Sequence, residues 1–293
     1  MTQDRDEAEI EASRAPLMDH LIELRGRLIW CVAAFAVAFV VCFFFAGPIY
    51  VFLVKPFAAA SALYAGSDGH NVSPIALIEV TAGLAPMPPT TTEAAQLIYT
   101  APLEILFTKM KLAGLGAIFL SFPVLAFQLW RFVAPGLYRN EKGAFLPFLF
   151  ASPMLFFLGA ALVYYVMLPF VMWFSLSQQI SSDTVAVALL PKVSEYLTLV
   201  TALILAFGLC FQLPVVMTLL GLAGMISSKL MSEGRRYAIV AVVVLAAIVT
   251  PPDPISQLML AVPLVILYEI SIWCVRLIEL RRKREDEAET VAA

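Results

Sequence analysis

The sequence predicts an all-α integral membrane protein with six transmembrane helices, of which the last two are short. Hydrophobic residues are 61% of the 293-residue chain and charged residues only 14%. Soluble domains average about 45–50% apolar and about 25% charged residues. The apolar residues are gathered into long runs separated by polar or proline-rich segments, so little of the chain remains for a separate water-soluble domain.

The amino-terminal region, residues 1–26, is expected to be cytoplasmic and to contain an interfacial helix. Leucines at helical spacing form its apolar face: Leu17, Leu21, Leu24 and Leu28. On its polar face Glu23 precedes Arg27 by four residues, which is within reach for an ion pair. Two interpretations stay open: a self-paired helix lying in the membrane interface, or a Glu23 carboxylate that receives a cationic ligand.

The membrane domain is expected over residues 27–280. Its apolar segments are 27–46, 103–126, 144–174, 196–222, 237–250 and 255–275. The first four reach or exceed the roughly 20 residues needed to cross a hydrocarbon core of about 30 Å.

The fifth segment is too short to cross a full bilayer. At a rise of 1.5 Å per residue, 237–250 gives a helix of about 21 Å, and the prolines of 250–254 (TPPDP) must end it. Such a hairpin requires a locally thinned bilayer or a partner that covers the mismatch. The alternative is that the helix continues to Arg236 and that this side chain carries its charge to the interface.

Two further segments complete the organisation. Residues 47–101 form one long outer loop rich in Pro, Gly, Ser and Thr, in which we expect short helical pieces and a mobile tip. Residues 281–293 are a charge run, and we expect a disordered cytoplasmic tail.

The basic residues predict the orientation. Fifteen of the 19 Lys and Arg residues lie in the termini and in the two loops that share their side of the membrane. Short cytoplasmic loops carry such an excess, so both termini are expected to be inside. The amino terminus is acidic, which excludes a signal or transit peptide, and the net charge of −3 argues against a nucleic-acid binder.

The sequence offers no pattern for catalysis, a metal or a cofactor. The four cysteines lie inside apolar runs without metal-ligand spacing, and the chain has only two histidines. Zinc-protease, nucleophile-elbow and phosphate-loop motifs are absent. We therefore expect neither an enzyme nor a metal or cofactor site.

The loop between the second and third spans is the most informative stretch. Residues 128–142 place two Arg, one Lys and a single carboxylate, Glu141, among Trp, Phe and Tyr. A loop of this kind presents a defined recognition surface at the cytoplasmic membrane face.

Four strings in order resemble the TatC family, the multi-spanning subunit of the twin-arginine protein translocase. They are 21–25 (LIELR), 122–138 (beginning FP and including QLWRFVAPGLY) with Glu141, 206–214 (AFGLCFQLP) and 250–257 (TPPDPISQ). The resemblance covers about residues 17–280. It implies a receptor in the bacterial cytoplasmic membrane that binds twin-arginine signal peptides. It also implies self-association and assembly with single-span TatA and TatB subunits to export folded proteins, energised by the proton motive force.

The resemblance places the signal-peptide site on Glu23, Arg25, Phe132 and Glu141. The chemistry of the two loops agrees with that placement. A twin-arginine peptide carries two guanidinium groups. Carboxylates are suitable partners for them, because the planar donor fork of Arg matches carboxylate oxygens bidentately. Glu23 and Glu141 come from different loops on the same expected membrane face. An intraloop pair of Glu141 with Arg139 or Lys142 is the alternative.

Several other positions match the family. Gln212, two residues before Pro214, stands where the family commonly has Glu, a partner contact within the membrane; the alternative is a bond to the carbonyl freed by Pro214. Asp253 is either functional or a cap of the sixth helix, and Gln257 follows it. Pro56 and Glu104 also match, and we expect Glu104 to pair with Lys111.

A proton-coupled secondary transporter of a small solute is the competing interpretation. It needs a titratable carboxylate near the middle of the membrane in a discontinuous helix. Glu269 is the only candidate, and it lies toward the inner end of the sixth span. No internal repeat supports this class.

Overall fold

The computed structural model describes residues 3–66, 72–88, 96–133, 145–181, 186–187, 190–249 and 254–292. Its regular elements are helices apart from a two-residue antiparallel pairing of β1 with β2 and an isolated bridge between Ile98 and Lys192. The elements are α1 (Gln3–Phe44), α2 (Ala46–Gly66), α3 (Pro74–Ala82), α4 (Glu104–Val133), α5 (Phe145–Leu162), a π-helical turn (Val163–Met167), α6 (Leu168–Ser177), β1 (Ile180–Ser181), β2 (Ala186–Val187), α7 (Val193–Cys210), α8 (Leu213–Leu222), α9 (Ser228–Glu233), α10 (Arg235–Val249) and α11 (Pro254–Ala292).

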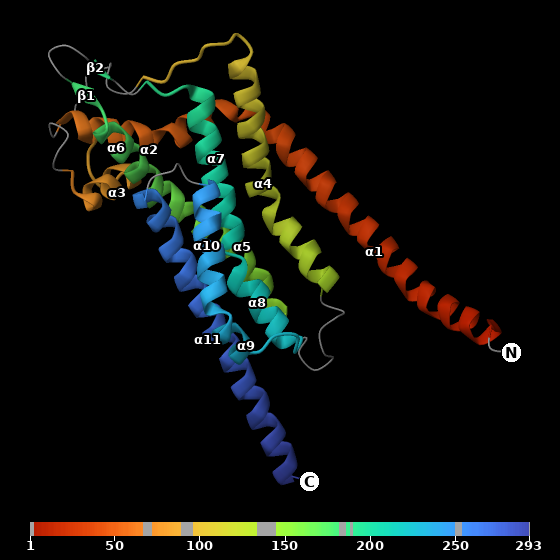
Figure 1. Ribbon diagram of the computed structural model, residues 1–293. Coiled ribbons are helices and arrows are strands. Elements are labelled where there is room, and N and C mark those ends of the chain that lie inside the picture. The colour runs from red at the N-terminus through yellow and green to blue at the C-terminus, as the bar shows by residue number, and fades with distance from the viewer. Residues whose placement is uncertain are drawn as a thin grey trace.

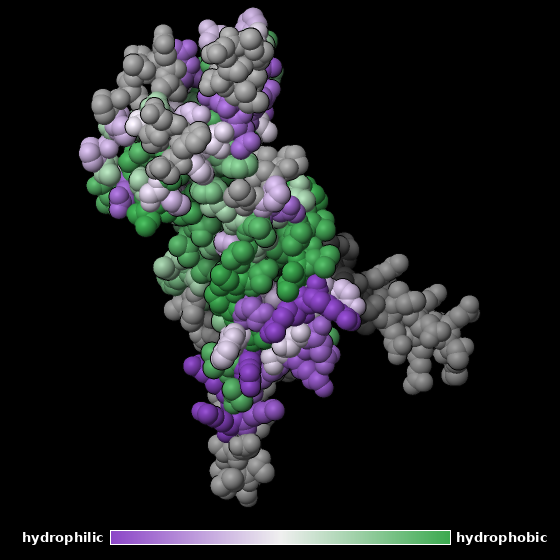
Figure 2. Space-filling view, turned by 60° about the vertical axis from the view of Figure 1, so that its left-hand side comes forward, coloured by the Kyte–Doolittle hydropathy of each residue, from purple (hydrophilic) through white to green (hydrophobic). Residues whose placement is uncertain are grey.

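The helices form a bundle with a cap at one end. Figure 1 shows α4, α7, α10 and α11 running steeply between the two ends, while α2 lies crosswise near α3 and α6 at the end away from both termini. Figure 2 shows apolar side chains gathered across the middle of one face, with hydrophilic side chains toward both ends. This distribution is that of a chain surrounded by lipid at its middle.

Six segments of the described residues are long and apolar enough to span a membrane, which agrees with the predicted fold class. They are Ile22–Phe44, Ala46–Gly66, Glu104–Phe132, Phe148–Ser177, Val193–Leu222 and Ser256–Arg281. The set differs from the predicted one because α2 qualifies by length, although it lies crosswise in Figure 1. By contrast α10, with 15 residues or about 22 Å, falls short.

The structure differs from the predicted organisation in three details. The expected interfacial segment and the first span are one continuous helix, α1, because a single Gly26 costs only about 1 kcal/mol and does not end a helix. Of the last two helices only α10 is short, since α11 has 39 residues. The charge run at its end is helical to Ala292, because opposite charges four residues apart and strong helix formers favour a helix.

The long outer loop is more ordered than expected. It contains α2, with 21 residues, and the nine-residue α3. Ser73 caps α3 by accepting from the Ile75 amide at 3.3 Å, and Gly83 ends it with a positive φ of 76°. Residues 67–70, within the expected mobile tip, lie outside the described residues.

The centre of the bundle depends on two glycines that face two phenylalanines across α5 and α7. A Cβ on Gly208 would lie 2.6 Å from the Phe156 ring, and one on Gly159 would lie 2.8 Å from the Phe211 ring. Phe156 and Phe207 are fully buried there. Small residues at helix interfaces allow such close approach in membrane proteins, so this pair of contacts sets the distance between α5 and α7.

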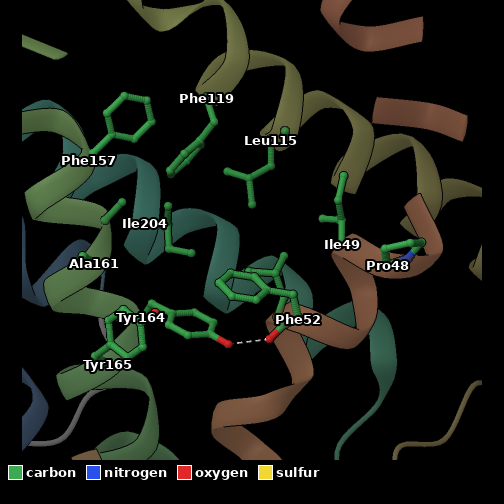
Figure 3. Close-up of a pocket in the computed structure, with 13 residues that line it drawn as sticks. Pro48, Ile49, Phe52, Leu115, Phe119, Phe157, Ala161, Tyr164, Tyr165 and Ile204 are labelled. Atoms are coloured by element: carbon green, nitrogen blue, oxygen red, sulfur yellow. Dashed lines mark hydrogen bonds between the residues drawn. The ribbon is translucent and has the colours of Figure 1, made fainter. Parts of the chain in front are cut away.

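Pro56 lies inside the continuous helix α2, and two tyrosines complete the hydrogen bonding around it. Because proline has no amide hydrogen, the carbonyl of Phe52, four residues earlier, loses its helical donor. The Tyr164 hydroxyl, from the π-helical turn, donates to that carbonyl at 2.7 Å, and its ring stacks on Phe52 at 4.3 Å (Figure 3). The Tyr196 hydroxyl of α7 donates to the next carbonyl, Leu53, also at 2.7 Å.

Candidate functional site

The amino-terminal carboxylate Glu23 is held by its neighbour on α1. Arg27 donates to Glu23 Oε1 from Nε at 3.1 Å and more closely from a terminal guanidinium nitrogen. The predicted pairing is therefore confirmed. The Glu23 side chain is 40% exposed and that of Arg27 only 15%, so the carboxylate is the accessible member of the pair.

The end of α4 lies at the same level as Glu23. Helices α1 and α4 pack along each other, and a Cβ on Gly116 would lie 2.9 Å from the Cys42 sulfur. Toward the start of α1, Glu23 lies about 28 Å from Cys42 at a rise of 1.5 Å per residue. Toward the end of α4, Phe132 lies about 24 Å from Gly116. The structure thus brings Glu23 and Phe132 to one end of the molecule.

The remaining predicted signal-peptide residues fall at that end or outside the described chain. Arg25 is exposed on α1, and Phe132 is half-buried in the last turn of α4. Beside it the Arg131 guanidinium lies 5.9 Å from the Phe127 ring centre. Glu141 belongs to the undescribed segment 134–144, so its position relative to Glu23 stays a prediction.

Gln212 makes a reciprocal contact with Ser152 of α5. Its Oε1 accepts from the Ser152 hydroxyl at 2.7 Å, and its Nε2 donates to the Ser152 carbonyl at 2.8 Å. This contact occurs at the break between α7 and α8, just before Pro214. The alternative of a bond back to the carbonyl freed by Pro214 is not what the structure shows, because the amide reaches a neighbouring helix instead. Sequence reasoning missed Ser152, since only the fold brings residues 60 apart together.

The expected ion pair between Glu104 and Lys111 is wrong. Glu104 accepts hydrogen bonds from the amides of Thr100 at 2.8 Å, Ala101 at 3.3 Å and Ser194 at 3.3 Å. Lys111 donates to the Thr198 hydroxyl at 3.1 Å. Unpaired amides near helix starts attract a carboxylate. Glu104 and Lys111 therefore do not pair with each other, and each one joins α4 to α7.

Polar contacts fasten α9 and α10 to α11. Arg235 pairs with Glu269 through two contacts, Nε at 2.7 Å and a terminal nitrogen at 2.9 Å. Tyr268 donates to the Met231 carbonyl at 2.9 Å. Glu279 accepts from the Ser228 amide at 2.8 Å and from its hydroxyl. The Glu279 contact was missed, although a carboxylate facing the first turn of a helix is a favourable arrangement.

Two predicted positions lie between the end of α10 and the first turn of α11. Gln257 Nε2 donates to the Val243 carbonyl at 3.2 Å, which joins the start of α11 to the middle of α10. Asp253 lies in the undescribed segment 250–253, so neither its capping role nor a functional role is tested. Pro56, the remaining predicted position, is buried inside α2, which continues through it.

Helix α10 is the least covered of the described membrane helices after α1. Only Val242 and Ala246 are buried along it. Its exposed apolar side chains include Val240, Val244 and Ile248. Helix α10 starts at Arg235, so it includes Arg236 as the alternative expected, and the Arg236 guanidinium lies 4.8 Å from the Tyr237 ring centre. The helix still spans only about 22 Å.

Comparison with known proteins assigns the family. The family model of the Sec-independent protein translocase protein (TatC) matches residues 19–263. The TatC protein of Magnetococcus marinus is 42% identical over 94% of this chain and 89% of its own length, and that of Haemophilus influenzae is 36% identical over 89% of each.

A solved structure agrees with the sequence comparisons. The crystal structure of a twin-arginine translocase receptor, TatC, is 32% identical and superposes with a TM-score of 0.67, covering 88% of this chain and 98% of that one. Two thirds or more of both chains are covered in every one of these matches. The chain therefore belongs to the TatC family of Sec-independent protein translocase components, which are membrane proteins of a transport system and not enzymes.

Proposed function

We propose that this chain is the receptor subunit of a twin-arginine translocase. In this proposal it binds twin-arginine signal peptides at the end that carries Glu23, Arg25, Phe132 and Glu141. It assembles with TatA- and TatB-type single-span subunits, and with further copies of itself, to export folded proteins. Family membership supports the translocase component, and the solved relative is itself named a receptor.

The accessible Glu23 carboxylate is the observation that best supports peptide binding. Arg27 is largely buried while the Glu23 carboxylate is 40% exposed, so Arg27 orients Glu23 and the carboxylate stays accessible from solvent. A signal peptide with two adjacent guanidinium groups offers a partner for this carboxylate, because each guanidinium can bind a carboxylate bidentately. Glu141 is proposed as the second carboxylate.

The proposed orientation places both termini in the cytoplasm of a bacterium, with the protein in its inner membrane. Both helices that carry the termini extend to the same end of the molecule (Figure 1). The excess of basic residues in the termini and their neighbouring loops favours the cytoplasmic side for that end. The cap of α2, α3 and α6 then faces outward.

The uncovered apolar face of α10 is proposed as the surface for a partner's single span. A helix of about 22 Å leaves part of a hydrocarbon core of about 30 Å unmatched. A partner span laid against Val240, Val244 and Ile248 relieves that mismatch. The proposal treats this face as a docking surface and not as the wall of a closed pore.

The transporter interpretation has no comparable support. Glu269 is paired bidentately with Arg235 at the start of α10, whereas a proton-coupling carboxylate needs to exchange its proton within the membrane. The family match assigns the chain to a protein translocase instead.

Glu23→Ala and Glu141→Ala are each predicted to weaken capture of a twin-arginine peptide. Each loses one charge-assisted contact at a partly exposed site, which corresponds to about 0.5–1.5 kcal/mol, or roughly two- to tenfold in Kd. The measurement is binding of a fluorescent peptide to the detergent-purified complex at fixed salt.

Glu233→Ala is the matched control for this experiment, because Glu233 is an exposed carboxylate on α9 at the same end of the molecule. It should leave Kd unchanged. A double variant of Glu23 and Glu141 that captures the peptide as well as the native complex would remove both residues from the receptor role.

Cysteines placed along α10 are predicted to crosslink to a partner span by position. After replacement of the four native cysteines, Val240→Cys, Val244→Cys and Ile248→Cys should crosslink to a TatA- or TatB-type subunit. Val242→Cys should not, because that side chain is buried within this chain. Labelling of all exposed positions by lipid-phase probes alone, unchanged by added partners, would contradict the proposed surface.

Gln212→Leu is predicted to weaken partner assembly by about 0.6–2 kcal/mol, the range for one polar contact between helices in lipid. Gln212→Glu should be tolerated in its protonated form, because the carboxylic acid can still accept from the Ser152 hydroxyl and donate to the Ser152 carbonyl. The measurements are co-purification of the single-span subunits and transport of a folded cargo.

Ser152→Ala separates a partner role of Gln212 from a packing role. It removes only the hydroxyl that Gln212 accepts from, so it should lower the unfolding temperature slightly and leave partner assembly intact. A Gln212→Leu protein with normal assembly and transport would show that Gln212 only packs α8 against α5.

A further inference from the structure

An apolar groove lies between α5, α8 and α11. Helix α8 forms its floor with Pro214 and Val215, while Ala151 of α5 and Cys274 of α11 stand on opposite walls. The floor packs tightly on α11, because a Cβ on Gly221 would lie 3.0 Å from Val275. The groove is separate from the exposed face of α10 and from Glu23.

The groove is apolar along its length and charged at one end. Thr218, which also lines it, donates its hydroxyl to the Pro214 carbonyl and so presents no unpaired donor. Arg281 is the single charged residue among its described lining residues. Among the described side chains Arg281 has no ion pair, and the neighbouring Glu279 carboxylate is bound by Ser228.

The dimensions favour a hydrocarbon chain over a helix. The lining residues of α11 run from Ile270 to Arg281, about 16 Å at 1.5 Å per residue. The groove has a volume of about 430 Å³ and is open along one side. A helix about 10–12 Å across would place only one of its faces there, whereas an extended acyl chain can lie along the whole apolar lining.

We propose that this groove binds one acyl chain of an anionic phospholipid, with the lipid phosphate on Arg281. The guanidinium matches phosphate oxygens bidentately, and basic pockets between membrane helices are known positions for anionic headgroups. Two further exposed basic residues, Lys283 and Arg284, follow on α11 before the acidic residues 285–287. The site uses no residue of the proposed receptor surface.

The test is lipid binding by the purified chain in detergent, followed by native mass spectrometry during titration with phosphatidylglycerol or phosphatidylcholine. Arg281→Gln should weaken phosphatidylglycerol binding at least fivefold and phosphatidylcholine binding less, because the choline ammonium already offsets the charge of that lipid's phosphate. Ala151→Phe should weaken binding of both lipids, because its ring fills the groove. Inorganic phosphate should not displace the lipid, since it offers no acyl chain.

Two controls match these variants. Arg276→Gln removes an exposed charge from the same helix outside the groove, and Ala36→Phe adds a ring at an exposed position of α1; neither should change binding. Equal phosphatidylglycerol binding by Arg281→Gln and the native chain would overturn the proposal. So would an Ala151→Phe variant that keeps lipid but loses a single-span subunit, because the groove would then be a protein docking site.

Discussion

A proline inside a packed helix imposes the main constraint: the carbonyl that it leaves without a helical donor must find another donor within the protein. Lipid offers no hydrogen bonds, so an unsatisfied carbonyl there costs several kcal/mol. Pro56 frees the Phe52 carbonyl, and Tyr164 donates to it. At the break before Pro214 the Gln212 side chain bonds to Ser152, which joins this point of the chain to α5.

Pro56 and the break before Pro214 shape the surfaces on which the proposed function depends. The bonds from Tyr164 and Tyr196 fix α2 against the π-helical turn and α7, so α2 can lie across the end of the bundle as a cap (Figure 1). The break before Pro214 separates α8 from α7, and α8 then packs on α11. The same break therefore yields the groove proposed for lipid. Helix α10, held to α11 by Arg235 and Glu269, is left with an uncovered face.

The sequence predicted what periodicity and local spacing determine. Long apolar runs identified the membrane class, and spacing of four identified the Glu23–Arg27 pair. Contacts between distant segments could not be predicted in the same way. Lys111 turned to Thr198 because α7 brings a hydroxyl within reach, which no local pattern reveals.

Loop composition was also a poor guide, because Pro, Gly, Ser and Thr between residues 47 and 101 concealed the 21-residue α2. Its interior proline argues against a helix locally. The tertiary hydrogen bonds from Tyr164 and Tyr196 stabilise the helix despite that proline. The helical end of α11 was misjudged for the opposite reason. A charge run indicates disorder by composition, but pairs of opposite sign four residues apart favour a helix.

Hydrogen–deuterium exchange of α2 tests whether the hydroxyls of Tyr164 and Tyr196 stabilise this helix around Pro56. In the Tyr164→Phe, Tyr196→Phe double variant, backbone amides between residues 53 and 60 should exchange at least tenfold faster, while those of α10 keep their native rates. Tyr165→Phe is the control, because its hydroxyl has no hydrogen-bond partner among the described residues. Native exchange rates in α2 of the double variant would contradict this, since the helix around Pro56 would then not depend on these two donors.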